Sequence, residues 1–335
     1  MRLPLPPCRP SIVAVLALLA LAAAPARAAE EHAAPLSPAL LDAVVHVETR
    51  VPAEARTAGL LGTERQGSGV VIDDDGLIVT IGYLVMEAMA AEITTRDGKP
   101  VLAAIVGFDN ESGLGLLRAQ EKLAVKPIRI GSAKGVAVET PVLLAAAGRA
   151  QPAKISSRRP FAGFWEYLID DAIFTTPPLT DWSGAALIGE DGKLLGIGSL
   201  LVGNAGESGG PLPGNLFVPI DLLEPALGDL LTAGRPQGAP RPWLGLYLAP
   251  TDRGFLVLNV STGGPAEKAG LSRGDRIVAV AGERVTGLAA FWRKLWAQGD
   301  AGVTVPLTIE QDGARRDIDV PSVDRYRYLK LNTSY

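Results

Sequence analysis

Short apolar runs separated by Gly, Asp and Pro dominate the chain from Ala43 to about Pro219. Examples are AVVHVET, GVVID, LIVTIG, AEITT, VLAAIVGF, PVLLAAA, LLGIGSLL and NLFVPI. Asp-Gly pairs at 75–76, 97–98 and 191–192 fall between such runs, and this pair favours the tight turn of a β-hairpin. Many short strands joined by tight turns predict an all-β barrel or sandwich.

The pattern changes after Pro219. Residues from Ile220 to about Leu231 have helical spacing, and the stretch that follows, TAGRPQGAPRP, has the Pro and Gly content of a linker. A second β-rich unit then contains a predicted helix over 288–298 and a hairpin that turns at Asp312-Gly313. We therefore divide the chain into a first domain over 38–232, a linker over 233–242, a second domain over 243–324 and a loose tail over 325–335.

The first 28 residues have the pattern of a secretory signal peptide. Arg2 and Arg9 precede an apolar run from Ile12 to about Ala24, and Ala-Arg-Ala at 26–28 is a small-x-small cleavage site. The apolar run is shorter than the ~20 residues that span a bilayer, which argues against an uncleaved membrane anchor. Export to the periplasm is the predicted localisation.

Composition excludes several classes of site. The full chain is 47% hydrophobic and carries a net charge of −4, and losing the arginine-bearing leader makes it more acidic, so nucleic acid is not an expected partner. The single cysteine, Cys8, precedes the apolar run and is lost on cleavage, and the chain has 2 histidines. Thiol catalysis, a metal site and a cofactor are therefore not expected.

Several motifs resemble those of the HtrA (DegP-like) periplasmic proteases. The matching segments are GSGVVIDDDGLIVT, ALIGEDGKLLGI and FVPID in the first domain, and WLGL with GGPAEKAGLSRGDRIVAVAGERV in the second. The resemblance covers about 38–324. It implies a mainly β, chymotrypsin-like double β-barrel followed by a C-terminal PDZ domain.

The resemblance also locates the catalytic positions, and three of four carry the wrong residue. Tyr83 follows Thr-Ile-Gly where the family has its histidine, and Gly113 stands at the position of the family aspartate. Asp181-Trp182-Ser183-Gly184 aligns with the nucleophile motif, so Ser183 is kept while Asp181 replaces the oxyanion-hole glycine.

These departures predict a protein without protease activity. A phenol with an ordinary pKa of about 10 cannot accept a proton from serine at neutral pH as imidazole does. Losing the base of a serine protease costs about a million-fold in turnover. At Asp181 a Cβ and a carboxylate both oppose an oxyanion hole built on glycine.

Two alternatives to this assignment involve other residues. Ser208 lies in Gly-Glu-Ser-Gly-Gly-Pro-Leu, which is closer to a nucleophile motif than the Ser183 segment. However, Ser208 runs directly into NLFVPIDLL, whereas a nucleophile turn leads into two strands joined by a tight turn, as Ser183 does. Neither His32 nor His46 matches the base position, and His46 is interpreted as a strand residue.

Tyr83 and Trp182 also suggest what replaced the chemistry. Large aromatic side chains at two neighbouring active-site positions would fill the cleft that a substrate carbonyl enters. We call this the plugged-cleft hypothesis.

The second domain keeps the residues for peptide binding. Trp243, Leu244, Gly245 and Leu246 match the PDZ loop whose backbone N–H groups hold a peptide carboxylate. In the predicted helix, Phe291, Trp292 and Leu295 are apolar, and either line the side-chain pocket or pack in the core. A purely structural PDZ domain that binds no free peptide is the alternative. The chain ends in Asn-Thr-Ser-Tyr, which could dock on a neighbouring subunit.

Three functions remain open from the sequence. The first is a non-catalytic periplasmic protein that binds peptides or unfolded proteins through its PDZ domain. The second is an active endopeptidase using Ser183 or Ser208 with an unusual base. The third is a structural or regulatory subunit of an active HtrA-like protease, and the resemblance also implies a homo-oligomer, commonly a trimer.

Overall fold

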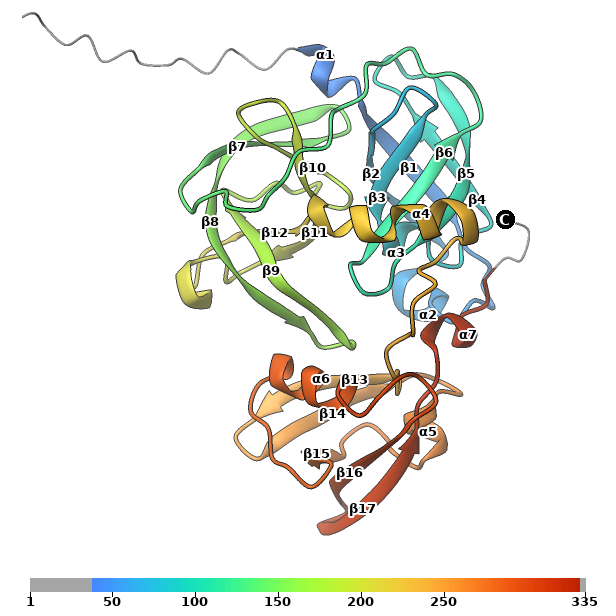
Figure 1. The fold of residues 1–335 in the computed structure, drawn as a ribbon, viewed down its shortest axis with the longest axis vertical. Helices are drawn as coiled ribbons and strands as arrows, with labels where there is room; N and C mark the ends of the chain where they lie inside the picture. Colours follow the sequence, from blue (N-terminus) through green and yellow to red (C-terminus); the bar gives the residue numbers. More distant parts are fainter. Residues whose placement is uncertain (1–37, 332–335) are drawn as a thin grey trace, which may run out of the picture. The chain divides into compact units, whose positions relative to one another are not determined.

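The computed structural model describes residues 38–331, and its first unit is a closed six-stranded barrel (Figure 1). The strands follow the order β1-β2-β3-β6-β5-β4, and every neighbouring pair is antiparallel. They are β1 (Val44–Arg50), β2 (Glu64–Val71), β3 (Leu77–Ile81), β4 (Ala90–Thr94), β5 (Pro100–Phe108) and β6 (Leu114–Ala119). Short helices α1 (Pro38–Leu41), α2 (Ala58–Leu61) and α3 (Gly82–Val85) accompany them.

A second closed six-stranded barrel follows, in the order β10-β11-β12-β9-β8-β7. Its strands are β7 (Pro141–Ala146), β8 (Arg149–Gly163), β9 (Tyr167–Thr176), β10 (Ala186–Ile188), β11 (Leu194–Val202) and β12 (Gly214–Pro219). A 3-10 turn, η1 (Glu207–Gly209), lies between β11 and β12. The expected double β-barrel is confirmed.

The C-terminal unit is a five-stranded sheet in sequential order. Its elements are β13 (Leu246–Thr251), β14 (Gly254–Val260), α5 (Pro265–Lys268), β15 (Arg276–Val280), α6 (Leu288–Trp296), β16 (Thr304–Gln311) and β17 (Ala314–Pro321). The last hairpin turns at Asp312 and Gly313, both at positive φ (51° and 79°), between the paired residues Gln311 and Ala314. Asp-Gly tolerates this backbone, which matches the strand twist.

The helix expected from Ile220 to Leu231 is wrong at both ends. The structure has a 3-10 turn, η2 (Ile220–Leu222), followed by α4 (Glu224–Ala233). Pro225 lies in the first turn of α4, where its missing N–H costs nothing, and Gly234 ends the helix in a left-handed conformation with φ 71°. The helix therefore extends into the stretch interpreted as linker. No helix among residues 38–331 is long and apolar enough to cross a membrane.

The tail expected to be loose is instead packed against the first barrel as far as it is described. It contains α7 (Arg325–Tyr328), and Leu329 is buried in the core of that barrel. The Tyr326 hydroxyl accepts from the backbone N–H of Asn110 and donates to the carbonyl of Phe108. Tyr326 and Tyr328 alternate with arginines, but so short a segment does not indicate which distant element it packs against. Residues 1–28, expected to be a signal peptide, and the terminal Asn-Thr-Ser-Tyr lie outside the described residues.

Ending the chain after Asp324 is expected to lower the free energy of unfolding by about 2–4 kcal/mol. The loss combines the burial of Leu329, about 2 kcal/mol, with the hydrogen bonds of Tyr326, about 1 kcal/mol each. Urea denaturation measures it. A matched chain ending after Leu331 keeps every described contact and should match the full mature chain; equal stability of both truncations would contradict this prediction.

Candidate functional site

Ser183 lies in the turn between β9 and β10, where the second barrel meets the first. Its carbonyl accepts a hydrogen bond of 2.7 Å from the N–H of Ser68 in β2, and the N–H of Gly184 donates to the carbonyl of Gly198 at 2.9 Å. The Ser183 hydroxyl oxygen is buried and has no hydrogen-bond partner. The backbone of this turn is therefore held firmly while its hydroxyl is not engaged by any base.

Tyr83 occupies the base position on α3, directly after β3. Its hydroxyl donates to the carbonyl of Ser199 in β11 at 3.0 Å, which joins the two barrels. Burial raises the pKa of Tyr83 to about 12, against contacts with Ser183 and Trp182 that lower it. The Ser183 side chain is thus close to the phenol without forming a hydrogen bond of acceptable geometry. A phenol with this pKa is a donor at neutral pH and cannot act as a base.

Gly113 is close to Tyr83, in the loop between β5 and β6. Its carbonyl accepts from the N–H of Gly82 at 2.7 Å, and its backbone is left-handed with φ 79°. A Cβ at this position would lie 2.8 Å from the hydroxyl of Tyr167, which donates to the carbonyl of Ser112 at 2.6 Å. Tyr167 thus takes the space that an aspartate side chain would need. Burial also raises the pKa of Tyr167.

Asp181 is exposed and forms an ion pair with Arg149, 3.2 Å apart. The non-glycine residues at positive φ among 38–331 are Glu87, Glu139, Glu166, Ser208, Ala281 and Asp312. Asp181 is not one of them, so its backbone does not adopt the left-handed conformation open to glycine.

The alternative nucleophile, Ser208, lies elsewhere. It is exposed in η1, between β11 and β12, whereas Ser183 leads through β10 and a tight turn into β11. His46 lies on β1, where its ring bonds the carboxylate of Glu48 at 3.2 Å. The structure therefore brings Tyr83, Gly113 and Ser183 together and leaves Ser208 and His46 apart from them.

The burial of Ser183 is the arrangement that the plugged-cleft hypothesis requires. Tyr83 and Trp182 are both partly buried beside it. Beside the Ser183 side chain, the phenol of Tyr83 stands in place of the imidazole of the base. Such a site can bury a serine but offers it no acceptor for its proton.

The predicted peptide-binding loop, 243–246, ends at the first residue of β13 and is already bound by a side chain of this protein. The carboxylate of Glu166 accepts hydrogen bonds from the backbone N–H groups of Leu244 (3.1 Å), Gly245 (2.6 Å) and Leu246 (2.8 Å). Glu166 belongs to the loop between β8 and β9 of the second barrel. Sequence analysis missed it, although a glutamate within the aromatic run FAGFWEY was a signal.

Glu166 is buried and adopts a left-handed backbone with φ 57°. Burial raises the pKa of its carboxyl to about 7, opposed by the hydrogen bonds of the loop and by the charge of Arg325. Arg325, on α7, is partly buried, and loss of solvent around its guanidinium lowers its pKa. The loop N–H groups and Arg325 are the groups that offset the cost of burying this carboxylate.

Two further contacts fix the tip of the β8–β9 hairpin on the PDZ domain. The N–H of Leu248 in β13 donates to the carbonyl of Phe164, and the indole N–H of Trp292 in α6 donates to the carbonyl of Gly163, both at 2.8 Å. Phe291, Trp292 and Leu295 are fully buried in the PDZ core. Of these three, Trp292 also contacts the hairpin.

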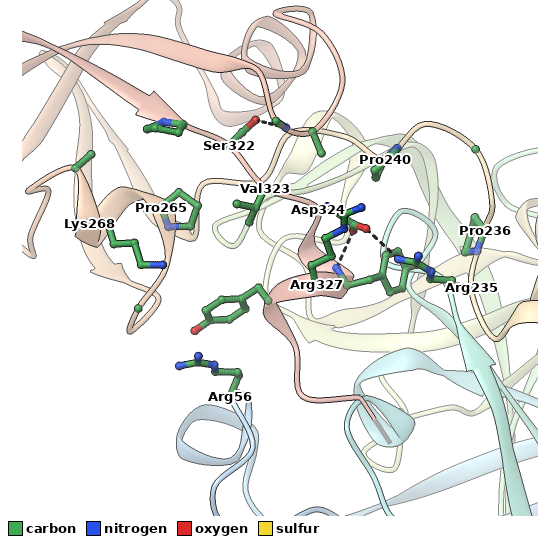
Figure 2. Close-up of a pocket in the computed structure, with 18 of the residues that line it drawn as sticks. Arg56, Arg235, Pro236, Pro240, Pro265, Lys268, Ser322, Val323, Asp324 and Arg327 are labelled. Carbon is green, nitrogen blue, oxygen red and sulfur yellow. Dashed lines mark hydrogen bonds and ion pairs between the residues drawn. The ribbon is translucent and has the colours of Figure 1, made fainter. Parts of the chain in front are cut away.

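A cavity of about 920 Å³ opens beside the linker and α7. Figure 2 shows Asp324 directed toward Arg235, with which it pairs at 2.9 Å, and Arg56 and Lys268 at the opposite side. None of the residues that the sequence assigns to catalysis or to the peptide loop lines it.

Comparison with protein families agrees with this architecture. Residues 67–197 match the trypsin-like peptidase domain family, and residues 242–321 match the PDZ domain family.

Among curated proteins, the chain is 28% identical over 283 residues to a probable periplasmic serine endoprotease DegP-like of Chlamydia trachomatis, covering 76% of this chain and 53% of that protein. It is 28% identical over 273 residues to a putative serine protease HhoA of Synechocystis, covering 70% and 63%. The chain therefore spans about half to two thirds of the length of these relatives.

Solved structures share the fold. The HtrA-type protease AlgW with tripeptide has a TM-score of 0.50 and 21% identity, covering 84% of this chain and 94% of that one. The serine endoprotease from Yersinia pestis has a TM-score of 0.50 and 22% identity, covering 87% and 99%.

Proposed function

This chain belongs to the HtrA/DegP family, and from that premise we propose that it is a non-catalytic member that binds peptides in the periplasm. The observation that carries the proposal is the Ser183 hydroxyl, which is buried without a hydrogen-bond partner beside a tyrosine in the base position. A nucleophile of this kind needs a hydrogen-bonded base to be activated.

The size of the expected rate loss favours complete loss of protease activity over a reduced activity. Loss of the base costs about a million-fold in turnover. A tyrosine whose pKa burial raises to about 12 does not replace it. The Gly113 position has no space for an orienting carboxylate, because Tyr167 fills it. Each role fails for a separate physical reason, so a single compensating residue would not restore turnover.

Peptide binding is supported by the second domain. The N–H groups of Leu244, Gly245 and Leu246 converge on one carboxylate oxygen, Oε1 of Glu166. Backbone N–H groups in this arrangement bind the carboxylate at a peptide's C-terminus. A relative of the same fold, AlgW, has a structure with a tripeptide. For this chain we propose peptides with a free C-terminus, because the loop N–H groups converge on a carboxylate oxygen.

The cellular setting and assembly are part of the proposal. Relatives are named periplasmic proteases, and the expected leader at 1–28 would direct export. HtrA-like proteins commonly form trimers, so we propose a homo-oligomer or an assembly with an active HtrA-like protease.

The purified mature chain is expected to leave casein uncleaved, at the level of Ser183→Ala and Ser208→Ala variants. The assay measures release of labelled fragments over a day, with a commercial serine protease as a positive control. Cleavage that Ser183→Ala abolishes would overturn the proposal and favour an active endopeptidase, the activity named for the relatives. Cleavage that only Ser208→Ala abolishes would identify Ser208, in η1, as the nucleophile.

Peptide binding is tested separately with fluorescein-labelled decapeptides that end in Val, Leu or Phe. We expect binding with a free C-terminus and loss of binding with an amidated one, because the amide removes the charge that the loop N–H groups recognise. Equal binding of both forms would contradict recognition by the loop.

A further inference from the structure

The tip of the β8–β9 hairpin forms the pattern of hydrogen bonds that a peptide with a terminal carboxylate would form with this domain. Phe164 and Glu166 are two residues apart, and so are Leu248 and Leu246, their hydrogen-bonding partners in the PDZ domain. Alternate residues of a strand direct their N–H groups to the same edge. A peptide whose terminal carboxylate lay on Leu246 would therefore present the carbonyl two residues earlier to Leu248, as Phe164 does.

The side chain of Glu166 takes the place of a terminal carboxylate. Its Oε1 accepts from the N–H groups of all three loop residues, with the shortest bond from Gly245 at 2.6 Å. The chain continues through Tyr167 into β9, so a main-chain carboxylate is not available here. A glutamate side chain supplies the same chemical group from within a loop.

Glu166 has features of a residue held in place by its surroundings. It has a positive φ of 57°, which is uncommon for a residue with a side chain. Such conformations persist where neighbouring contacts determine them, and they cluster at clamps and switch regions. The neighbouring contacts here are the loop N–H groups, Arg325 and the indole of Trp292 on Gly163.

We propose that the β8–β9 hairpin is an internal ligand of the PDZ domain, with Glu166 in the carboxylate site, so that an external peptide binds only after the hairpin withdraws. This regulation rests on the proposed peptide-binding function. The internal ligand and the external peptide compete for the same N–H groups, and the apparent affinity for peptide falls by the fraction of molecules that are closed.

The test compares the mature chain with its Glu166→Ala variant. Glu190→Ala is the matched control, because Glu190 is an exposed turn residue. The probe is the set of labelled decapeptides with a free C-terminus. We expect Glu166→Ala to bind them at least about tenfold more tightly, and Glu190→Ala to bind like the unchanged protein.

Hydrogen exchange provides a readout that does not depend on peptide. The amides of Leu244, Gly245 and Leu246 are expected to exchange at least about tenfold faster in Glu166→Ala, because their acceptor is gone. Unchanged affinity and unchanged exchange would overturn the internal ligand and leave peptide binding intact. Faster exchange without peptide binding by either protein would overturn both this proposal and the peptide-binding function.

A second variant weakens docking without touching the buried groups. Asp170 in β9 forms an exposed ion pair with Arg293 in α6. Asp170→Arg places like charges at this contact, and we expect a two- to threefold rise in peptide affinity, of the size of an exposed ion pair. The exchanged pair Asp170→Arg with Arg293→Asp should return the affinity to its original value. An affinity unchanged by Asp170→Arg would contradict withdrawal of the hairpin.

Discussion

Replacing Gly184 with alanine is expected to destabilise the protein by more than about 4 kcal/mol. Gly184 has a φ of 72°, and an added Cβ would lie far inside contact distance of the Ser68 carbonyl oxygen and 2.6 Å from the hydroxyl oxygen of Thr80. Both groups belong to the buried face of the first barrel. The clash of the added Cβ could be relieved only if the two barrels moved apart at this turn.

Urea denaturation with a matched glycine control measures this effect. Gly203 has no neighbouring atom within 4 Å of an added Cβ, and its φ is not positive. Gly203→Ala should therefore change the free energy of unfolding by no more than about 0.5 kcal/mol. Similar stabilities of the two variants would show that the turn adapts to a side chain.

This prediction bears on why the Ser183-Gly184 pair is present in a site without a base. Gly184 is required by the approach of β2, and the Ser183 carbonyl accepts from Ser68. Neither contact uses the Ser183 hydroxyl. Gly184 therefore has a structural explanation that is independent of proteolysis, whereas the backbone contact of Ser183 would be made by any residue at that position.

Peptide affinity is expected to rise at least about tenfold between pH 5 and pH 8, and this rise should vanish in Glu166→Ala. Burial raises the pKa of Glu166 from an ordinary 4.5 to about 7 in the docked hairpin. At pH values between these two pKa values, the Glu166 carboxyl is therefore protonated in the docked state and ionised in the undocked state. Docking is strongest below pH 4.5 and weakens as pH rises through 7, by about 300-fold at most.

The affinity for external peptide rises as docking of the hairpin weakens, because the two compete for the same N–H groups. Its terminal carboxyl, with an ordinary pKa of about 3.5, stays ionised throughout this range. Arg325 is the charged side chain that acts on Glu166, and its guanidinium remains protonated. Fluorescence anisotropy at half-unit pH steps measures the profile, with Glu190→Ala as the control that should keep the slope. A falling affinity with rising pH would contradict the prediction.

Much of the candidate catalytic site could be predicted from local sequence. Tyr83, Gly113 and Ser183 were located by aligning short motifs with those of the HtrA proteases, and the resemblance implies that these positions meet. The local pattern could not predict which other residues surround these positions. Tyr167, which fills the space beside Gly113, lies more than 50 residues further along the chain, and no local periodicity links the two.

The sequence by itself determined the short strands and the Asp-Gly hairpins, because alternation and turn chemistry act over a few neighbouring residues. Its resemblance to the HtrA proteases, and not these patterns, implied two barrels followed by a PDZ domain. Only the tertiary structure decided that Glu166 binds the PDZ loop and that Leu329 joins the core of the first barrel. Both are single side chains in short segments, one in the loop between β8 and β9 and one directly after α7. Their partners are set by the packing of distant elements, which no short stretch of the chain encodes.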